Sequence, residues 1–324
     1  IEFGGNLDVP GLESGKTASA RIDYIGADLA AAIDGADVIM CTAPAHAHRA
    51  MAVDLAAHLA AGQVVVLNPG RTCGAIEVAR VLQENGAPSD ITVVEAQTLL
   101  YACRRTGNAV HVFGLKDRVG CAARPADQLD RFLKPMQAAL PQFVKEEQGI
   151  WATSLDNIGM LFHPTPTLFN LARMETGPSF DYYIDGMSPT IAALVEKLDG
   201  ERCGIAQAMG VEIPTAVQWL KLTYGAEGSS LFEAVQNNQA YVGIKAPQLK
   251  GVADKLGLRY VVEDVPTGLV PVSELGRKLG IPTPNIDLLI RVADMVYDRD
   301  FRSEGRTLQR LGLAELSTEQ LKAL

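Results

Sequence analysis

Two short apolar runs, Val38-Ile39-Met40-Cys41-Thr42 and Val64-Val65-Val66-Leu67, decide how this chain is expected to fold. Pro44 follows the first run and Asn68-Pro69-Gly70 follows the second. Continuous apolar runs of this length are typical of parallel strands that are buried on both faces of a sheet. The residues between them, 50–61, have helical apolar spacing and end at Gly62, so the two strands flank a helix.

The same alternation continues outward from these runs. The apolar spacing predicts further strands at residues 91–94 and 109–113, and further helices at residues 27–34, 74–83 and 126–139. Strands and helices that alternate at this spacing form βαβ units, so the first half of the chain is predicted to be a doubly wound α/β domain.

The second half of the chain has a different character from about Gly149 onward. Strand-like runs give way to amphipathic segments with helix caps, at residues 188–209, 214–224, 285–298 and from Ser230. We therefore expect two domains, an α/β domain over residues 1–148 and an all-α domain over residues 149–324. A length of 324 residues is consistent with about two domains.

Composition limits the classes of function. The chain is 48% hydrophobic and 21% charged, with a net charge of −9, which argues against a nucleic-acid surface. No apolar run reaches the roughly 18 residues of a membrane helix. The five cysteines are odd in number and lack C-x-x-C spacing, so neither a disulfide framework nor a zinc site is expected. This cysteine usage indicates a reducing compartment, the cytoplasm. His46 and His48 have no third ligand nearby, so no metal is predicted, and His48 is expected to cap the next helix or line a cleft.

Three loops that follow predicted strands are the candidate ligand edge. They cover residues 42–48, 68–72 and 95–98 and are rich in small residues. Ligands of doubly wound sheets bind beyond the carboxyl ends of the strands, where small residues let backbone amides approach closely. Such loops need small residues anyway, but three in succession favour a ligand site. The G-x-G-x-x-G fingerprint is absent, so motifs alone leave nucleotide binding open.

His163 and a later acidic segment are the candidate chemistry of the second half. His163 precedes Pro164, which biases the backbone away from regular helix, and a lone histidine of this kind is more often a core residue than a catalyst. The segment Arg259–Pro266 reads as a strand edge that ends in Glu263 and Asp264. Asp264 would supply the carboxylate that orients a catalytic histidine, and Arg259 a fork for a substrate carboxylate.

At these residues the sequence resembles the NAD(P)-dependent octopine/nopaline (opine) dehydrogenase family over nearly its whole length. The resemblance rests on residues 42–48, 62–70 and 95–104 in the first half, and in the second on His163-Pro164, Asn170, Tyr182-Tyr183 with Gly186, residues 198–202, Arg259-Tyr260 and residues 263–266. It implies a Rossmann domain fused to a helical substrate domain. The implied activity is the NAD(P)H-dependent reductive condensation of an amino acid with a 2-oxo acid, with pyruvate favoured, and the reverse oxidation.

The resemblance also implies the site residues. His163, Arg259 and Asp264 match the family's catalytic set, in which the arginine and aspartate lie five residues apart. The expected cofactor, NAD or NADP, would lie near Thr42, Ala43, Pro44, Ala45, Asn68, Pro69, Gly70 and Glu95. The expected substrate residues are Gln97, Thr98, Asn157 and Tyr183.

The first residues depart from the family pattern. The chain opens Ile1-Glu2-Phe3-Gly4-Gly5, without the fingerprint that the family carries at its N-terminus. We therefore expect that about one βαβ unit, roughly 30–40 residues, is missing before residue 1. The residue that separates NAD from NADP normally ends the second strand of such a unit, so the choice of cofactor stays open.

Two alternative functions remain at this stage. One is another dehydrogenase with the same two domains, acting on a 2-hydroxy acid, a ketopantoate-like substrate or a metallophore precursor. The other is a nucleotide-binding protein without turnover. The oligomeric state is open, with a homodimer as one option.

Overall fold

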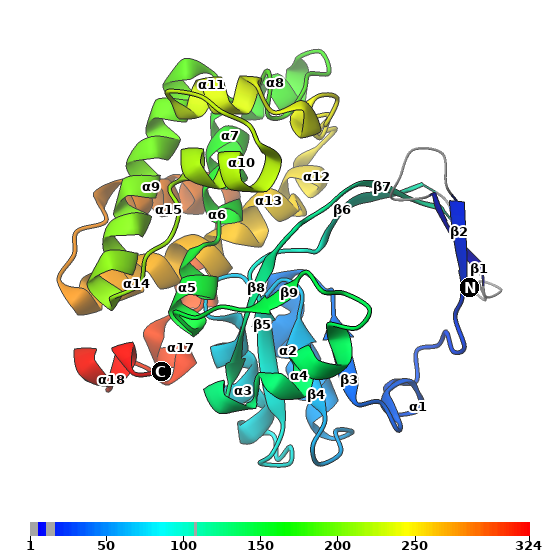
Figure 1. The fold of residues 1–324 in the computed structure, drawn as a ribbon. Helices are drawn as coiled ribbons and strands as arrows, with labels where there is room; N and C mark the ends of the chain where they lie inside the picture. Colours follow the sequence, from blue (N-terminus) through cyan, green and yellow to red (C-terminus); the bar gives the residue numbers. More distant parts are fainter. Residues whose placement is uncertain (1–5, 11–16, 107–108) are drawn as a thin grey trace.

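The α/β part of the molecule is built on a five-stranded sheet, which lies in the lower half of Figure 1. The computed structural model describes residues 6–10, 17–106 and 109–324. The sheet order is β3-β4-β5-β8-β9, with β3 Val38–Cys41, β4 Val64–Leu67, β5 Thr92–Ala96, β8 Val119–Arg124 and β9 Phe143–Lys145. β3, β4 and β5 are parallel, whereas β8 runs antiparallel to β5 and β9 parallel to β8.

The register of the parallel strands brings three loops to one edge. Cys41 is paired with Leu67, and Leu67 is paired with Glu95, so the three strands end side by side. The loops that follow them therefore start level with one another. The three loops therefore lie at one edge of the sheet as predicted, whereas ligand binding at this edge stays a prediction. The predicted strands at residues 38–42, 64–67 and 91–94 are present within one or two residues.

Helices cover both faces of the sheet. α1 Leu29–Ile33, α2 His48–Ala56, α3 Gly74–Glu84 and α4 Asp130–Met136 belong to this part. Val65 and Leu67 of β4 share a hydrophobic core with α2 and α3, whereas Val64 and Val66 pack in a second core with Phe132 of α4. Because neighbouring side chains of a strand point to opposite faces, the all-apolar β4 sequence fills both cores.

A long hairpin leaves the sheet, and here the sequence prediction was wrong. β6 Tyr101–Thr106 and β7 Ala109–Leu115 pair with each other and extend as an arm to β1 Asn6–Pro10 and β2 Thr17–Arg21 (Figure 1). The four strands form a separate sheet of order β2-β1-β7-β6. The strand predicted at residues 109–113 exists, but outside the doubly wound sheet. An apolar run shows that a strand forms, not which neighbour it pairs with.

Helices make up the rest of the chain, which forms the upper half of Figure 1. They are α5 Ile150–Leu155, α6 Gly159–Phe162, α7 Pro164–Phe169, α8 Leu171–Thr176, α9 Pro189–Met209, α10 Ala216–Tyr224, α11 Leu231–Gln236, α12 Val252–Leu256, α13 Arg259–Val262, α14 Val270–Leu279, α15 Pro284–Tyr297, α16 Phe301–Glu304, α17 Leu308–Leu311 and α18 Thr318–Lys322. A π-helical turn, Val265–Leu269, joins α13 to α14. The strand edge predicted at Arg259–Pro266 is therefore wrong, because this segment is helical.

The C-terminal helices return to the α/β part. α17 packs against α3, and the indole of Trp151 on α5 donates a hydrogen bond to the carbonyl of Leu321 on α18 at 2.7 Å. The two parts therefore share one contiguous core, which includes Val78 of α3 and Leu308 of α17. A division of the chain at residue 149 stays a prediction.

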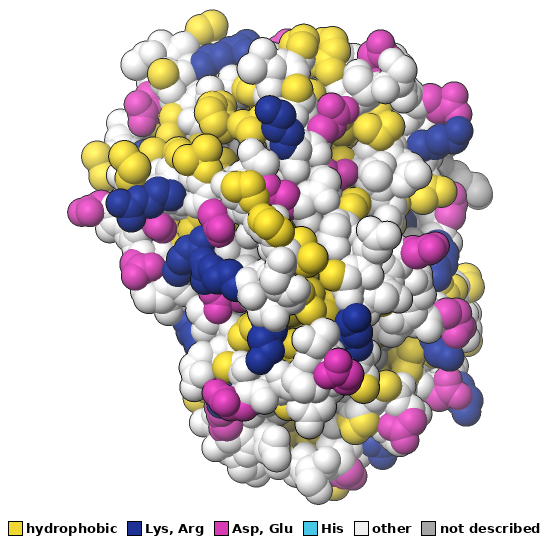
Figure 2. Space-filling view, turned by 90° about the vertical axis from the view of Figure 1, so that its left-hand side faces the viewer, with side chains coloured by type: hydrophobic (Ala, Val, Ile, Leu, Met, Phe, Trp, Pro, Cys, Tyr) yellow, Lys and Arg dark blue, Asp and Glu magenta, His cyan; other side chains and the backbone are white. Residues whose placement is uncertain are grey.

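The surface carries charges of both signs. Figure 2 shows Lys and Arg side chains interspersed with Asp and Glu, and hydrophobic side chains running in a band between them. In the part of the chain that the structure describes, none of the helices combines the length and the apolar character needed to cross a membrane.

Candidate active site

His163 and Asp264 form a hydrogen-bonded pair inside the helical part. His163 lies between α6 and α7, where Pro164 starts α7, and Asp264 directly precedes the π-helical turn. The Nδ1 atom of His163 is 2.8 Å from Oδ2 of Asp264. The His163 side chain is 13% exposed and that of Asp264 is 1% exposed, so only the imidazole reaches solvent. The contact predicted from the sequence is confirmed.

The charge state of Asp264 follows from its neighbours. Burial disfavours the ionised carboxyl, but His163 and Arg71 outweigh it and hold the pKa of Asp264 below its usual value. An ionised Asp264 accepts the Nδ1–H of His163, which fixes the tautomer with Nε2 unprotonated in the neutral ring. Among the described residues, none hydrogen-bonds Nε2, so this atom is available to a substrate.

Two tyrosines hold the imidazole in place. The ring of Tyr260 stacks on that of His163, with centroids 4.4 Å apart and planes 17° apart. The hydroxyl of Tyr182 donates to the backbone carbonyl of His163 at 2.7 Å. The imidazole is therefore fixed on its face, at Nδ1 and at its backbone. Sequence reasoning assigned Tyr260 no role, although this residue stands in the segment that carried the resemblance.

The structure places a different arginine beside the pair from the one predicted. Arg259 is half-exposed and its Nε atom contacts Glu263 at 2.9 Å, one helical turn away. Arg71, which follows Gly70 in the loop after β4, lies with its Nε atom 4.0 Å from Asp264 Oδ1 and 3.6 Å from Glu263 Oε1. Nε of Arg71 is buried, and none of the described residues accepts a hydrogen bond from it. The catalytic role predicted for Arg259 stays a prediction.

Gly159 makes room for Arg71. A Cβ atom on Gly159 would lie 2.5 Å from Nη1 of Arg71 and 3.0 Å from Oδ1 of Asp264. Nη1 of Arg71 donates to the side-chain oxygen of Asn157 at 3.3 Å, and Nδ2 of Asn157 donates to Thr72 at 3.2 Å. Asn157, predicted as a substrate residue, is thus buried and binds the loop after β4.

The loop after β3 meets the helical part at Ala45. The backbone N–H of Ala45 donates to Glu263 Oε1 at 3.1 Å. Ala45 is buried, Ala43 and Pro44 are half-buried, and Thr42 is exposed. The predicted cofactor residues 42–44 therefore present an accessible edge, and Ala45 anchors that edge.

The loop after β4 offers a fit for a polar cofactor group. Asn68 and Gly70 are buried, and the side-chain oxygen of Asn68 has no hydrogen-bond partner among the described residues. A buried amide oxygen without a partner is unusual in proteins, because it costs the desolvation of that group. The carboxamide edge of a nicotinamide, which can donate hydrogen bonds, suits this acceptor. The residues present therefore fit a nicotinamide cofactor at this edge.

Glu95, predicted to contact the cofactor, is fully buried and fully bonded. Its Oε1 accepts from the hydroxyls of Thr153 at 2.8 Å and Ser154 at 2.7 Å, and its Oε2 accepts from the N–H of Ala75 at 3.0 Å. A side chain on Gly70 would collide with Glu95. Burial raises the pKa of Glu95, although these hydrogen bonds act to lower it. The structure therefore shows Glu95 joining the sheet to α3 and α5, and its predicted cofactor contact is untested.

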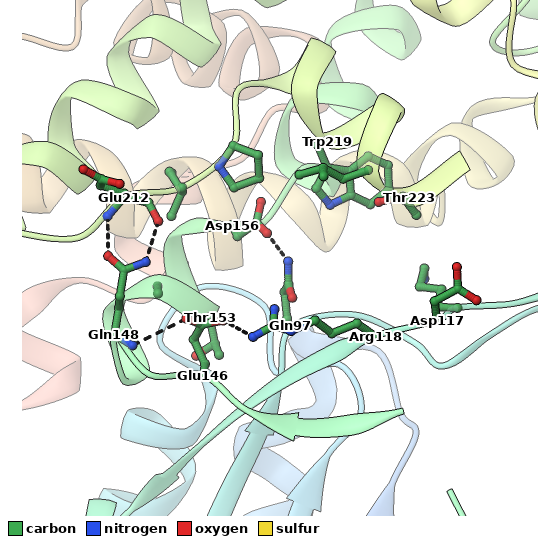
Figure 3. Close-up of a pocket in the computed structure, with 15 residues that line it drawn as sticks. Gln97, Asp117, Arg118, Glu146, Gln148, Thr153, Asp156, Glu212, Trp219 and Thr223 are labelled. Atoms are coloured by element: carbon green, nitrogen blue, oxygen red, sulfur yellow. Dashed lines mark hydrogen bonds and ion pairs between the residues drawn. The ribbon is translucent and has the colours of Figure 1, made fainter. Parts of the chain in front are cut away.

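A cavity of about 380 Å³ lies between the two parts (Figure 3). Gln97 and Thr153 line its lower side, Asp156 its centre and Trp219 its upper side. Gln97 donates a hydrogen bond to Asp156. Burial raises the pKa of Asp156 to about 7. Lys116 also lines the cavity and donates to Thr98 at 2.9 Å. Burial, and then Arg71, lower the pKa of Lys116 to about 8.

Of the predicted substrate residues, only some lie at this cavity. Gln97 lines the cavity and Thr98 binds Lys116, which lines it. Tyr183 is buried, and its ring stacks on Tyr241 with centroids 4.1 Å apart.

His48 is buried and bonded to the carbonyl of Ala43 at 3.2 Å, and burial lowers its pKa to about 3. In the described residues, no group of three or more His, Cys, Asp and Glu side chains is placed to hold a metal ion.

A buried arginine that sequence reasoning missed connects the loops. Arg306, between α16 and α17, donates to Glu77 on α3 at 2.7 Å, to the carbonyls of Gly70 at 3.1 Å and Thr72 at 2.7 Å, and to the carbonyl of Ala45 at 3.3 Å. Its Nη2 atom is also 3.1 Å from Nδ1 of His48. No sequence signal separates such an arginine from the exposed ones, because arginine is mostly a surface residue.

Comparisons with known proteins agree with this geometry. The family described as "NAD/NADP octopine/nopaline dehydrogenase, alpha-helical domain" matches residues 146–297. The chain is 40% identical over 311 residues to an opine dehydrogenase of Arthrobacter sp. (strain 1C), covering 95% of this chain and 84% of that protein. It is 27% identical over 302 residues to a vitopine synthase of Allorhizobium ampelinum, covering 90% and 80% of the two chains.

Solved structures give the same answer for the fold. An octopine dehydrogenase in complex with NADH and agmatine superposes with a TM-score of 0.77 at 21% identity, covering 99% of this chain and 87% of that one. The 40% identical relative and the family match make this chain an NAD(P)-dependent oxidoreductase that acts on the CH–NH group of its donors. The chain belongs to the opine dehydrogenase family.

Proposed function

We propose that this protein uses NAD(P)H to join the amino group of an amino acid to a 2-oxo acid, with pyruvate favoured, and that it catalyses the reverse oxidation. The observation that carries the proposal is the His163–Asp264 pair, which lies against Arg71 of the loop after β4. An acid/base pair, a guanidinium and the strand-end loops thus meet where the two parts of the chain join. The product is an N-(1-carboxyalkyl) amino acid.

His163 acts as the proton donor and acceptor. Asp264 keeps the Nδ1–H of His163 engaged, so Nε2 faces the reacting centre. Protonated at Nε2, His163 gives its proton to the substrate carbonyl oxygen as the amine adds. The neutral ring then takes a proton from the added nitrogen and passes it to the new hydroxyl, which leaves as water. In the reverse direction the neutral ring takes a proton back. The hydride that NAD(P)H supplies when bound adds to the imine carbon.

Arg71 binds the carboxylate of the 2-oxo acid. Its Nε donor is buried and has no acceptor within the described part of the chain, and its distances to Asp264 and Glu263 exceed those of a hydrogen bond. A guanidinium with free donors recognises a carboxylate through two parallel hydrogen bonds. Arg259, which the sequence favoured for this role, is half-exposed and bound to Glu263, so it is the second candidate.

The cavity of about 380 Å³ is the proposed site of the amino acid, and its lining residues do not include His163, Asp264 or Arg71. Trp219, Leu222 and Ile213 supply an apolar wall for a side chain, and Gln97 and Asp156 supply polar partners for the backbone groups. The cofactor lies along Thr42–Pro44 and Asn68–Gly70, with the unpaired Asn68 oxygen as a partner for its nicotinamide amide. NAD and NADP both fit this proposal.

A panel assay tests the proposed function. The full-length protein is mixed with pyruvate, single L-amino acids and NADH or NADPH, and the loss of nicotinamide absorbance is followed. Oxidation that depends on both the amino acid and the 2-oxo acid is expected, and H163A should abolish it while NADH binding is retained. Reduction of a keto acid without an amino acid would favour the alternative dehydrogenase, and binding without turnover would favour a non-catalytic protein.

The location and assembly of the protein are also proposals. All five cysteines are free thiols, which supports a cytoplasmic location. Leu288 and Met295, one heptad apart on α15, are 61% and 74% exposed, which supports a homodimer. Light scattering of the purified protein would measure its mass; a monomer at micromolar concentration would contradict the dimer.

A further inference from the structure

We propose that Arg306 is a positioning residue for the cofactor: it holds both strand-end loops of the nicotinamide edge from the far end of the chain. The inference rests on the proposed placement of the cofactor along Thr42–Pro44 and Asn68–Gly70. Arg306 touches neither substrate nor reacting atoms in this scheme. It acts through the backbone of the loops.

The contacts of the guanidinium are shared between the two loops. Nη1 donates to the carbonyls of Gly70 and Thr72, in the loop after β4. Nη2 donates to the carbonyl of Ala45, in the loop after β3. One rigid, planar group therefore fixes the spacing between the two segments that flank the proposed cofactor.

The remaining contacts of Arg306 hold its guanidinium in this position. Nε of Arg306 donates to Glu77 at 2.7 Å, and the side chains of both are almost fully buried. Nη2 is 3.1 Å from His48 Nδ1, and His48 Nε2 lies 3.2 Å from the carbonyl of Ala43. A protonated His48 would present an N–H to the guanidinium, so the contact requires the neutral ring. Neutral His48 accepts from Arg306 at Nδ1 and donates to Ala43 at Nε2, which extends the connection to the accessible residues of the loop.

A general structural role would not explain this distribution of contacts. Arg80 lies at the same junction of α3 and α17 and donates to the carbonyl of Gln309 at 3.2 Å and to Glu84 at 2.6 Å. It joins α3 to α17, and its hydrogen bonds among the described residues reach neither loop. Arg80 therefore provides a matched control for an arginine that bridges the two parts without reaching the cofactor edge.

The experiment measures NADH affinity and steady-state kinetics for the wild type, R306M, R306K and R80M in the full-length protein. Affinity is taken from NADH fluorescence, and the melting temperature is recorded with and without NADH. We expect R306M to raise the NADH dissociation constant at least about tenfold, and R306K to restore part of the loss, because lysine keeps the charge but not the fork. The kcat at saturating NADH and the KM for the amino acid should change less than about threefold. R80M should bind NADH as the wild type does.

The possible results distinguish a failure of the role proposed for Arg306 from a failure of the proposed function. A lower melting temperature with unchanged NADH affinity in R306M would overturn the positioning role, as would an equal affinity loss in R80M. If R306M does not fold, R306K is judged by the same two quantities. Failure of the wild type to bind either NADH or NADPH would instead refute the proposed function; if only NADPH binds, the same variants are compared with NADPH.

Discussion

Nδ1 of His163 and Oδ2 of Asp264 are 2.8 Å apart although 101 residues separate them in the chain. The pair joins the turn between α6 and α7 to the segment between α13 and the π-helical turn. Since Asp264 is buried and its pKa is lowered, its carboxylate accepts from Nδ1 and this contact orients the imidazole.

The first prediction concerns the orientation of His163. D264N should lower kcat about 10²- to 10⁴-fold, the usual contribution of a positioned acid or base, because the amide no longer enforces the tautomer. NADH affinity should stay within about threefold of the wild type. D287N is the matched control, since Asp287 bonds to Ser273 and Arg302 on the helical part. A D264N enzyme with wild-type kcat would remove the pair from the mechanism.

The second prediction separates the two arginines. R71M should raise the KM for the 2-oxo acid about 10- to 100-fold, the cost of losing a charge-assisted hydrogen bond, while R259M should raise it less. Initial rates at varied 2-oxo acid and saturating amino acid measure both. A larger effect of R259M would restore the role that the sequence indicated for Arg259.

The third prediction uses the space above Gly159. In G159A, the new methyl group would meet Nη1 of Arg71, which is the movable end of a long side chain. We expect Arg71 to be displaced, with a rise in the KM for the 2-oxo acid of at least about fivefold and little loss of stability. G200A is the control, because a Cβ there meets nothing within 4 Å. It should stabilise α9 by about 1 kcal/mol without affecting KM.

The fourth prediction concerns pH. Burial raises the pKa of Asp156 to about 7 in the folded protein, from 3.8. The folded state therefore binds this proton more tightly than the unfolded state, so its contribution to stability is present at low pH and is lost as pH rises from about 4 to 7. D156N should lose this dependence. Thermal unfolding of both proteins from pH 5 to 8 measures it, and parallel curves would show that the Asp156 pKa is not raised.

The features that could be predicted from the sequence are those set by local patterns. The apolar runs of β3 and β4 gave the parallel strands, and the loops that follow them were expected at one edge. The break between α6 and α7 falls at His163 before Pro164, as expected, although the backbone of His163 itself stays in the right-handed helical region. The resemblance to a family supplied the partner, Asp264, which no local pattern at residue 163 could identify.

The features that could not be predicted depend on tertiary packing. The segment at residues 259–262 contains Val261 and Val262, which favour strands, yet it is helical because it packs against α7 and the π-helical turn. Arg71 follows Gly70 in a loop, and nothing in its sequence context shows that the chain folds it over Asp264. Glu95 stands at a strand end like a ligand-binding residue, but the hydroxyls of α5 already satisfy it.

The position of Arg306 in the chain has a consequence for synthesis. Every strand of the five-stranded sheet has been made once residue 145 leaves the ribosome, and a domain can begin to fold as it emerges. The guanidinium that ties the loops at Ala45 and Gly70 follows 161 residues later, since 306 − 145 = 161. Until that residue emerges, the nascent α/β part has its sheet but lacks this link between its two loops.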